Sequence, residues 1–443
     1  MSAEQSKIIV IDDDPTGSQT VHSCPLLLRW DVETLRAGLA DPSPLCFILS
    51  NTRAMTPEQA AQVMREIAGN LRVVLQETAA SAKAPPILVS RSDSTLRGHY
   101  PFETDVLVEL LGPFDAHFLV PAFFEGGRTT RNGIHYVRQN GVDVPAHETE
   151  FARDSVFAFH HSYLPDYVAE KTRGRIPAAA VQRISLGELR EGGCLPRLLA
   201  LQNNACVVVD AETPADLAAF ARDVQQAVAQ GKRFLFRSAA SLLTALADLP
   251  PQPVAAAEMW RWVRNARPGL ILVGSHVRKT TEQLDCLLQG PDLEGVEVDV
   301  DRCQGAAAEA QLADIVRRAA AIHARGNDIV LYTSRSERQF ADQPTRLAFG
   351  AAVSAFLMHA LQVMPKSLGY LISKGGITSN DVLSQGLALR QARVLGQILP
   401  GCSMLQCPED HAQFPALPVV IFPGNVGDAA ALALARRRLR RTE

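Results

Sequence analysis

The chain has 443 residues, 47% of them hydrophobic and 21% charged, and carries a formal net charge of −3. This composition is typical of a globular protein with room for two or three domains, and the charge excludes an electrostatic footprint for nucleic acid. No long apolar run predicts a membrane span, and the N-terminus lacks a secretory-signal pattern. The eight cysteines are spaced singly, which favours reduced core thiols over disulfides or a metal cluster. We therefore expect a soluble, cytoplasmic protein.

Apolar runs alternate with helical patterns along the chain. In the first half we expect strands at 7–11, 45–49, 87–90, 117–121 and 205–209, separated by helices at 57–79, 101–112 and 214–230. A Pro-rich and then Ala-rich stretch at 248–257 predicts an interdomain linker. Beyond it we expect strands at 269–273, 295–299, 329–333, 368–373 and 419–422, with helices at 279–289, 305–325, 345–362, 379–398 and 428–439. This rhythm predicts two α/β domains with mostly parallel sheets, residues 1–250 and 258–443, and an active site in the interdomain cleft.

Three consecutive carboxylates, Asp12, Asp13 and Asp14, follow the first apolar run, and Pro15 and Gly17 then impose a turn. Ligands of open α/β sheets bind at this end of the strands. Crowded like charges at such a position predict a role in binding Mg²⁺, activating a hydroxyl or forming a phospho-aspartate. The plain alternative is a solvated acidic turn.

Four polar segments of the first half each follow an apolar run: Asp12–Gln19, Ser50–Arg53, Ser90–His99 and Glu125–Gly133. In a parallel sheet all four lie along one edge. Arginine grips carboxylates and phosphates with a planar fork, and small hydroxylic side chains suit sugar hydroxyls. The collection therefore predicts a pocket for a small polyhydroxylated acid, with structural Arg–Asp pairs between loops as the alternative.

The second half offers glycine-containing turns between strands and helices, at Gly274-Ser275, Gly375–Thr378 and Gly424–Asp428. Glycine lets the backbone approach a phosphate, and the helix N-terminus that follows supplies free N–H groups. Three such junctions predict a nucleotide phosphate site outside the P-loop and GxGxxG patterns. Lys374 precedes one turn and either neutralises phosphate charge or lies on the surface.

These motifs, in this order, resemble the four-carbon acid sugar kinase family. The resemblance rests on Asp13-Asp14-Pro15-Thr16-Gly17, Ser92-Asp93-Ser94-Thr95-Leu96-Arg97-Gly98, Gly127-Arg128-Thr129, Gly274-Ser275, Gly375-Gly376-Ile377-Thr378 and Pro423-Gly424-Asn425-Val426-Gly427-Asp428. It implies an N-terminal domain that binds the acid sugar, a C-terminal domain that binds ATP, and phosphorylation of the terminal hydroxyl of a four-carbon sugar acid. Threonate, erythronate and 3-oxo-tetronate stay open as substrates.

The resemblance also implies site residues. Nucleotide contacts fall on Gly274, Ser275, Gly375, Gly376, Ile377, Thr378, Gly424 and Asn425. Acid-sugar contacts fall on Asp13, Arg53, Ser92, Arg97 and Arg128, the last two holding the substrate carboxylate. Asp14 is the first choice for the base that receives the hydroxyl proton, and Asp93 is the second. Mg²⁺ bridges the ATP phosphates with help from an acid such as Asp381 or Asp428. The size and type of the enzyme suggest a homodimer.

Two other functions fit parts of the sequence. The run from Asp12 to Thr16 matches the DxDxT pattern of haloacid-dehalogenase-like phosphatases, with Asp12 as nucleophile and Asp14 as acid/base. That function leaves Ser92–Gly98 and Gly375–Thr378 without a role. A sugar-acid sensor that closes on its ligand without turnover is the non-enzymatic alternative.

Overall fold

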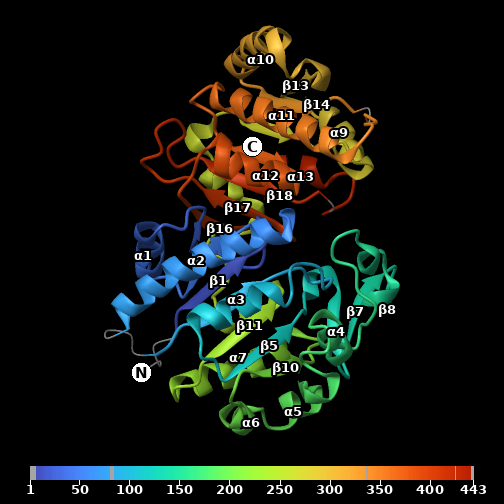
Figure 1. Ribbon diagram of the computed structural model, residues 1–443. Helices are drawn as coiled ribbons and strands as arrows, with labels where there is room; N and C mark the ends of the chain where they lie inside the picture. The colour runs from blue at the N-terminus through green and yellow to red at the C-terminus, as the bar shows by residue number, and fades with distance from the viewer. Residues whose placement is uncertain (1–5, 80–83, 336–337, 425, 441–443) are drawn as a thin grey trace. The chain divides into compact units, whose positions relative to one another are not determined.

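The computed structural model describes residues 6–79, 84–335, 338–424 and 426–440 (Figure 1). The chain divides into two compact units, Met1–Pro251 and Gln252–Glu443. Both contain a sheet with helices packed on it, so the predicted class of two α/β domains with mostly parallel sheets is confirmed. Among the described helices, none is both long and apolar enough to cross a membrane.

The sheet of the first unit is parallel throughout. Its strands lie in the order β2 (Cys24–Leu27), β3 (Leu45–Leu49), β1 (Ile8–Asp12), β4 (Ile87–Arg91), β11 (Phe234–Ser238), β5 (Ala116–Val120), β10 (Ala205–Val209) and β9 (Gln182–Ile184). Apolar side chains on both faces bury these strands, which is the usual pattern of a parallel sheet.

Helices cover both faces of this sheet. On one face β1 side chains such as Ile9 pack against α1 (Val32–Ala40), α2 (Pro57–Thr78) and α3 (Phe102–Leu111), and Figure 1 shows α2 and α3 lying across it. On the other face the ring of Phe220, from α7 (Pro214–Ala229), lies 5.6 Å from that of Phe118 on β5. The remaining helices are α4 (Leu164–Lys171), α5 (Leu186–Glu191), α6 (Leu195–Ala200) and α8 (Ala240–Ala247). A small antiparallel sheet joins β6 (Arg128–Arg131), β7 (Ile134–Gln139) and β8 (Val142–Pro145).

The second unit has a mixed sheet. Its strands lie in the order β13 (Leu293–Val298), β14 (Asp328–Thr333), β12 (Leu270–Val273), β15 (Leu371–Lys374), β18 (Pro418–Phe422), β17 (Cys402–Gln406) and β16 (Gln391–Leu399). The first five strands are parallel, and β17 and β16 continue the sheet antiparallel.

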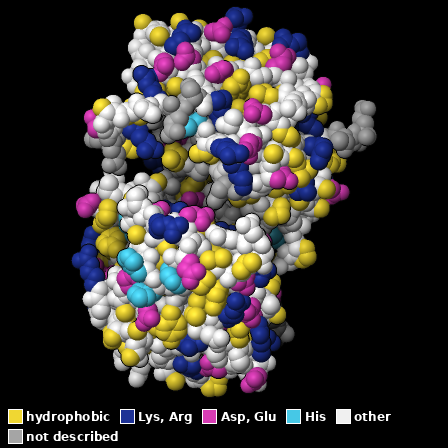
Figure 2. Space-filling view, turned by 90° about the vertical axis from the view of Figure 1, so that its right-hand side faces the viewer, with side chains coloured by type: hydrophobic (Ala, Val, Ile, Leu, Met, Phe, Trp, Pro, Cys, Tyr) yellow, Lys and Arg dark blue, Asp and Glu magenta, His cyan; other side chains and the backbone are white. Residues whose placement is uncertain are grey.

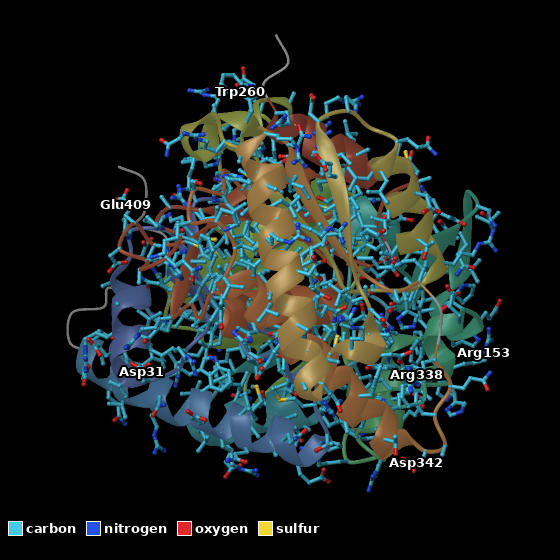
Figure 3. All side chains as sticks on the ribbon, turned by 90° about the horizontal axis from the view of Figure 1, so that it is seen from above. Asp31, Arg153, Trp260, Arg338, Asp342 and Glu409 are labelled. Atoms are coloured by element: carbon cyan, nitrogen blue, oxygen red, sulfur yellow. The ribbon has the colours of Figure 1, made fainter. Side chains whose placement is uncertain are left out.

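Five α-helices accompany this sheet in the described residues. Helices α9 (Arg278–Leu288) and α13 (Ala431–Leu439) share one apolar core with strands β12, β15 and β18. The others are α10 (Gly305–Ala324), α11 (Gln343–Gln362) and α12 (Gly376–Asp381). Figure 3 labels Arg338 and Asp342 at the beginning of α11, where the Asp342 carboxylate accepts a hydrogen bond from the Thr345 amide at 2.7 Å. Figure 2 shows basic and acidic side chains interspersed over the visible surface, in keeping with the small net charge.

One predicted helix is wrong. The pattern at 379–398 predicted a continuous helix, but α12 ends at Asp381, a π-helical turn spans Val382–Gly386, and Gln391–Leu399 forms β16. Ala388 has a φ of 48°, which stops the helix because this left-handed conformation cannot continue it. Strands β2, β9, β11, β16 and β17 and the small antiparallel sheet were not anticipated.

Candidate functional site

The carboxyl ends of five neighbouring strands form the candidate acid site of the first unit. Because β3, β1, β4, β11 and β5 are parallel, the register aligns their last residues: Leu49, Asp12, Arg91, Ser238 and Val120. The segments that follow these strands therefore lie along one edge of the sheet, which is the place predicted for the ligand.

The three consecutive carboxylates differ sharply in exposure. Asp12 and Asp13 are 1% and 2% exposed, whereas the side chain of Asp14 is 23% exposed. Burial raises the pKa of Asp12 to about 7, although Arg91 lies 3.2 Å away and opposes the shift. Burial would also raise the pKa of Asp14, but Arg53 and Arg91 outweigh it and lower that pKa below its usual range. Asp14 is therefore the ionised and accessible member of the three.

Asp12 is enclosed by the turn that follows it. A Cβ on Gly17 would lie 1.8 Å from the Asp12 carboxylate, so only glycine permits this approach. The phosphatase alternative needs Asp12 to attack a phosphate ester directly. A carboxylate that is 1% exposed and holds its proton up to about pH 7 is unsuited to that attack.

The Arg53 guanidinium lies close to the acidic side chains of two loops. Its guanidinium pairs with Asp13 and lies 3.3 Å from Asp14 and 3.9 Å from Asp93. Asp13 also accepts a hydrogen bond from the Ser92 hydroxyl at 2.7 Å. Asp13 and Ser92 are buried and direct their bonds inward, so of these predicted substrate contacts only Arg53 keeps a partly exposed side chain.

A buried ion pair holds these side chains in place. It was not predicted from the sequence. Arg237, on β11, donates to the Glu103 carboxylate and to the Ser92 hydroxyl, each at 2.6 Å. Thr52 also donates to Glu103. The run Phe234-Leu235-Phe236 could have predicted β11, since it is apolar and is followed by a polar pair, as in the other strands. That strand would have placed Arg237 at the same sheet edge.

Two arginines converge on the ring of Phe151. Arg97 lies 5.1 Å and Arg128 lies 6.0 Å from the ring centroid. Arg97 pairs with Asp93 at 2.7 Å, and although burial opposes it, Arg53 and Arg97 hold the pKa of Asp93 well below its usual range. Arg128 forms no ion pair within the described part of the chain, and its buried Nε has no hydrogen-bond partner. Burial lowers the pKa of Arg128, so this guanidinium is a positive group that an anion would stabilise.

A small cavity lies beside these arginines, lined by residues that include Asp93, Arg97, Arg237 and Ser238. Its volume of about 20 Å³ holds one water molecule rather than a sugar acid. A water there would give the Ser238 hydroxyl, which is buried without a partner, its hydrogen bond.

The glycine turns of the second unit also meet at one sheet edge. The register pairs Val273 with Lys374, and Lys374 with Phe422, so the turns after β12, β15 and β18 begin side by side. A Cβ on Gly274 would lie 2.4 Å from the Thr378 hydroxyl, which shows how closely the first two turns pack.

The other predicted nucleotide contacts belong to the same turns. Gly375 and Gly376 lead into α12, and a Cβ on Gly375 would lie 3.6 Å from Ser275 Cβ. Ile377 is 76% exposed, and the carbonyl of Gly424 accepts a hydrogen bond from Lys374 at 3.0 Å. Asn425, also predicted as a contact, lies outside the described residues.

The two acids considered for magnesium have different surroundings. Asp381 accepts a hydrogen bond from Ser354 on α11 and is buried, whereas Asp428 is exposed and accepts from the Ala430 amide at 3.1 Å. No group of three or more His, Cys, Asp or Glu side chains with the geometry of a metal site occurs among the residues described. Asp428 is therefore the more accessible of the two carboxylates, and the choice between them as a metal ligand stays a prediction.

Fold and sites together define a two-domain α/β protein of the sugar-binding and nucleotide-binding kind. Residues 8–246 match the family model of a sugar-binding N-terminal domain, and residues 270–432 match that of a nucleotide-binding C-terminal domain. The chain belongs to the four-carbon acid sugar kinase family.

Similar proteins include kinases of two four-carbon acids. The D-erythronate kinase of Heliobacterium modesticaldum is 30% identical over 229 residues, which cover 48% of this chain and 46% of that relative. The D-threonate kinase of Bordetella bronchiseptica is 27% identical over 296 residues, 63% of this chain and 62% of that one. The D-threonate kinase of Cupriavidus necator is 27% identical over 394 residues, 86% and 84%. The match thus spans less than two thirds of the first two relatives.

Two solved structures share the fold. A Salmonella typhimurium LT2 protein superposes with a TM-score of 0.72 at 19% identity and covers 99% of this chain and 100% of its own. A Haemophilus influenzae protein gives a TM-score of 0.69 at 17% identity, with 97% and 99% covered. At these identities the likeness shows the fold alone.

Proposed function

We propose that this protein is an ATP-dependent kinase that phosphorylates the terminal hydroxyl of a four-carbon acid sugar of the threonate, erythronate or 3-oxo-tetronate type. The observation that carries the proposal is Arg128. It is a partly buried guanidinium with no acidic partner in the described chain, next to Arg97 and on the same aromatic ring. A small carboxylate ligand satisfies this charge. The named activities of the erythronate and threonate kinase relatives agree with such a ligand.

In this scheme the predicted first domain, residues 1–250, binds the acid sugar. Arg128 and Arg97 bind its carboxylate, and Asp14 faces the terminal hydroxyl. The hydroxyl oxygen attacks the γ-phosphorus of ATP, its proton passes to Asp14, and ADP leaves. Because the pKa of Asp14 is lowered, this carboxylate is ionised at neutral pH and available to accept the proton. Asp93, held by Arg97, is the second choice for this role.

Asp13 acts on the ligand through Arg53, with which it pairs, and Ser92 acts through Asp13, to which its hydroxyl donates, because both side chains are buried. The predicted second domain, residues 258–443, binds ATP through its three turns, with Gly274 and Ser275, Gly375 to Thr378, and Gly424 and Asn425 as the contacts. Mg²⁺ bound to the ATP phosphates would supply charge neutralisation, and the exposed Asp428 would be the side chain to share it.

The deciding experiment is ADP release with Mg·ATP against a panel of four-carbon sugar acids. Wild type is compared with Asp14→Asn and with Asp105→Asn, a half-exposed carboxylate that pairs with Arg175 on the surface. We expect turnover with one acid, loss of that turnover in Asp14→Asn, and wild-type rates in Asp105→Asn. Hydrolysis of a phosphate ester without ATP, and no ADP release with any acid, would overturn the proposal.

The homodimer suggested by the size and type of the enzyme stays a prediction. Light scattering during size-exclusion chromatography of the full chain tests it.

A further inference from the structure

A partly buried arginine fixes the first of the nucleotide turns. Arg335, two residues after β14, donates through Nη2 to the Ser275 carbonyl at 2.7 Å and to the Thr281 hydroxyl at 2.9 Å. It forms no ion pair with any described acid, and its buried Nε and Nη1 have no hydrogen-bond partner. An unpartnered buried donor is costly, so each such group in a folded protein calls for an explanation.

Open space adjoins this arginine. A cavity of about 430 Å³ is lined by Arg335 and by residues at the start of α9: His276, Val277, Arg278, Thr281 and Glu282. This volume lies within the range of small-molecule sites. The cavity also adjoins the N-terminus of α9, whose first amides favour an anion.

A buried lysine fixes another of the turns in the same way. Lys374, the last residue of β15, is fully buried, and its ammonium donates to the carbonyls of Pro423 at 2.7 Å and Gly424 at 3.0 Å. The ring of Phe422 lies against the remaining side of the ammonium, with its centroid 4.4 Å from Nζ. Burial lowers the pKa of Lys374 to about 8, so the group keeps its charge at pH 7. It too has no acidic partner within ion-pair distance in the described part of the chain.

We propose that Arg335 and Lys374 are the positioning cations of the nucleotide site, an inference that rests on the kinase function proposed above. Arg335 binds a carbonyl of the Ser275 turn, and Lys374 binds carbonyls of the Gly424 turn. The amides of these turns are therefore free for a ligand. Neither forms an ion pair with a described carboxylate, although Asp285 and Glu297 partly oppose the lowering of the Arg335 pKa by burial, and both cations lie beside turns of the type that bind phosphate. The nucleotide polyphosphate is the anion that both charges would stabilise.

This proposal makes the effect of each cation depend on the charge of the ligand. The test measures binding of adenosine, AMP, ADP and ATP to the full chain by calorimetry, for wild type, Arg335→Met, Arg335→Lys and Lys374→Met. We expect Arg335→Met and Lys374→Met to weaken ATP binding about 10- to 100-fold and to leave adenosine binding within about twofold. Arg335→Lys, which keeps the charge, falls between wild type and Arg335→Met. Arg317→Met is the matched control, because Arg317 is an exposed arginine of α10 that pairs with Asp314.

Three results would overturn the proposal. Equal losses for adenosine and ATP would mean that the cations only hold the fold, and unchanged ATP binding would mean that their charge does not reach the phosphates. If Lys374→Met does not fold, the two Arg335 variants decide. A wild-type chain that binds no adenine nucleotide would reject the proposed function itself, whereas wild-type ATP binding with an unchanged Arg335→Met rejects the inference alone.

Discussion

The buried pair of Arg237 and Glu103 allows a direct test of how much a buried ion pair stabilises the acid site. The two side chains are 8% and 2% exposed, and the donor and acceptor are 2.6 Å apart. Arg237→Met leaves the Glu103 carboxylate buried without its cation and removes a bond to Ser92. Breaking a buried pair in this way costs about 3 to 5 kcal/mol. At about 2 to 4 °C per kcal/mol for a unit of this size, the unfolding temperature falls by about 6 to 20 °C.

Differential scanning calorimetry of the full chain measures this shift. The control is Arg36→Met, because Arg36 and Glu77 form a pair at 2.9 Å with both side chains about half exposed. An exposed pair contributes roughly 0 to 1 kcal/mol, so the control should move the transition little. The double variant Arg237→Met with Glu103→Leu should lose less than the two single variants together, because it leaves no unpaired charge. An Arg237→Met shift no larger than that of Arg36→Met would refute the reasoning.

Three further results follow from the same unit. Gly17→Ala should lower the unfolding temperature, because its Cβ falls 1.8 Å from Asp12, whereas Gly69→Ala, with nothing within 4 Å, should raise it; equal shifts would contradict the close approach. Between about pH 4 and 7 folded Asp12 holds a proton that the unfolded chain has lost, so stability falls as pH rises through this window. Asp12→Asn should therefore gain stability relative to wild type from pH 5 to 8 in thermal melts, and a constant difference would contradict the raised pKa. Arg128→Met should raise the KM for the sugar acid about 10- to 100-fold in steady-state kinetics without changing the KM for ATP, and an unchanged acid KM would exclude the carboxylate contact.

The positions of the acid-site residues could be predicted because they are encoded locally. Each short apolar run of β1, β3 and β4 is followed directly by polar residues, and a parallel sheet brings such segments to one edge. Which of Asp12, Asp13 and Asp14 is exposed could not be predicted. The exposure of each carboxylate depends on Arg53, which follows β3, and on Arg91, which ends β4. It also depends on how closely the turn with Gly17 packs on Asp12.

The second unit shows where the sequence signal is weaker. The segment 379–398 contains helix-forming residues, but tertiary pairing with β17 makes its second half a strand. Arg335 was overlooked because the turn after β14 has no glycine, although its strand was predicted correctly. A buried lysine such as Lys374 cannot be told from a surface lysine by its neighbours in sequence, since its carbonyl partners lie some fifty residues further along.

The two sites handle charge in opposite ways, and this difference bears on what each can bind. In the first unit, Asp13, Asp14 and Asp93 all face Arg53, so a small acid adds one negative charge to a nearly balanced cluster in which Arg128 has no ion-pair partner among the described residues. In the second unit, Arg335 and Lys374 hold turn carbonyls and form no ion pair with an acid in the described chain. A balanced cluster selects by geometry, because an unmatched hydroxyl or carboxylate leaves a buried group unpaired. A cluster with excess positive charge selects a ligand by its negative charge. This suits a polyphosphate, because the phosphate end of the ligand is the same in every turnover.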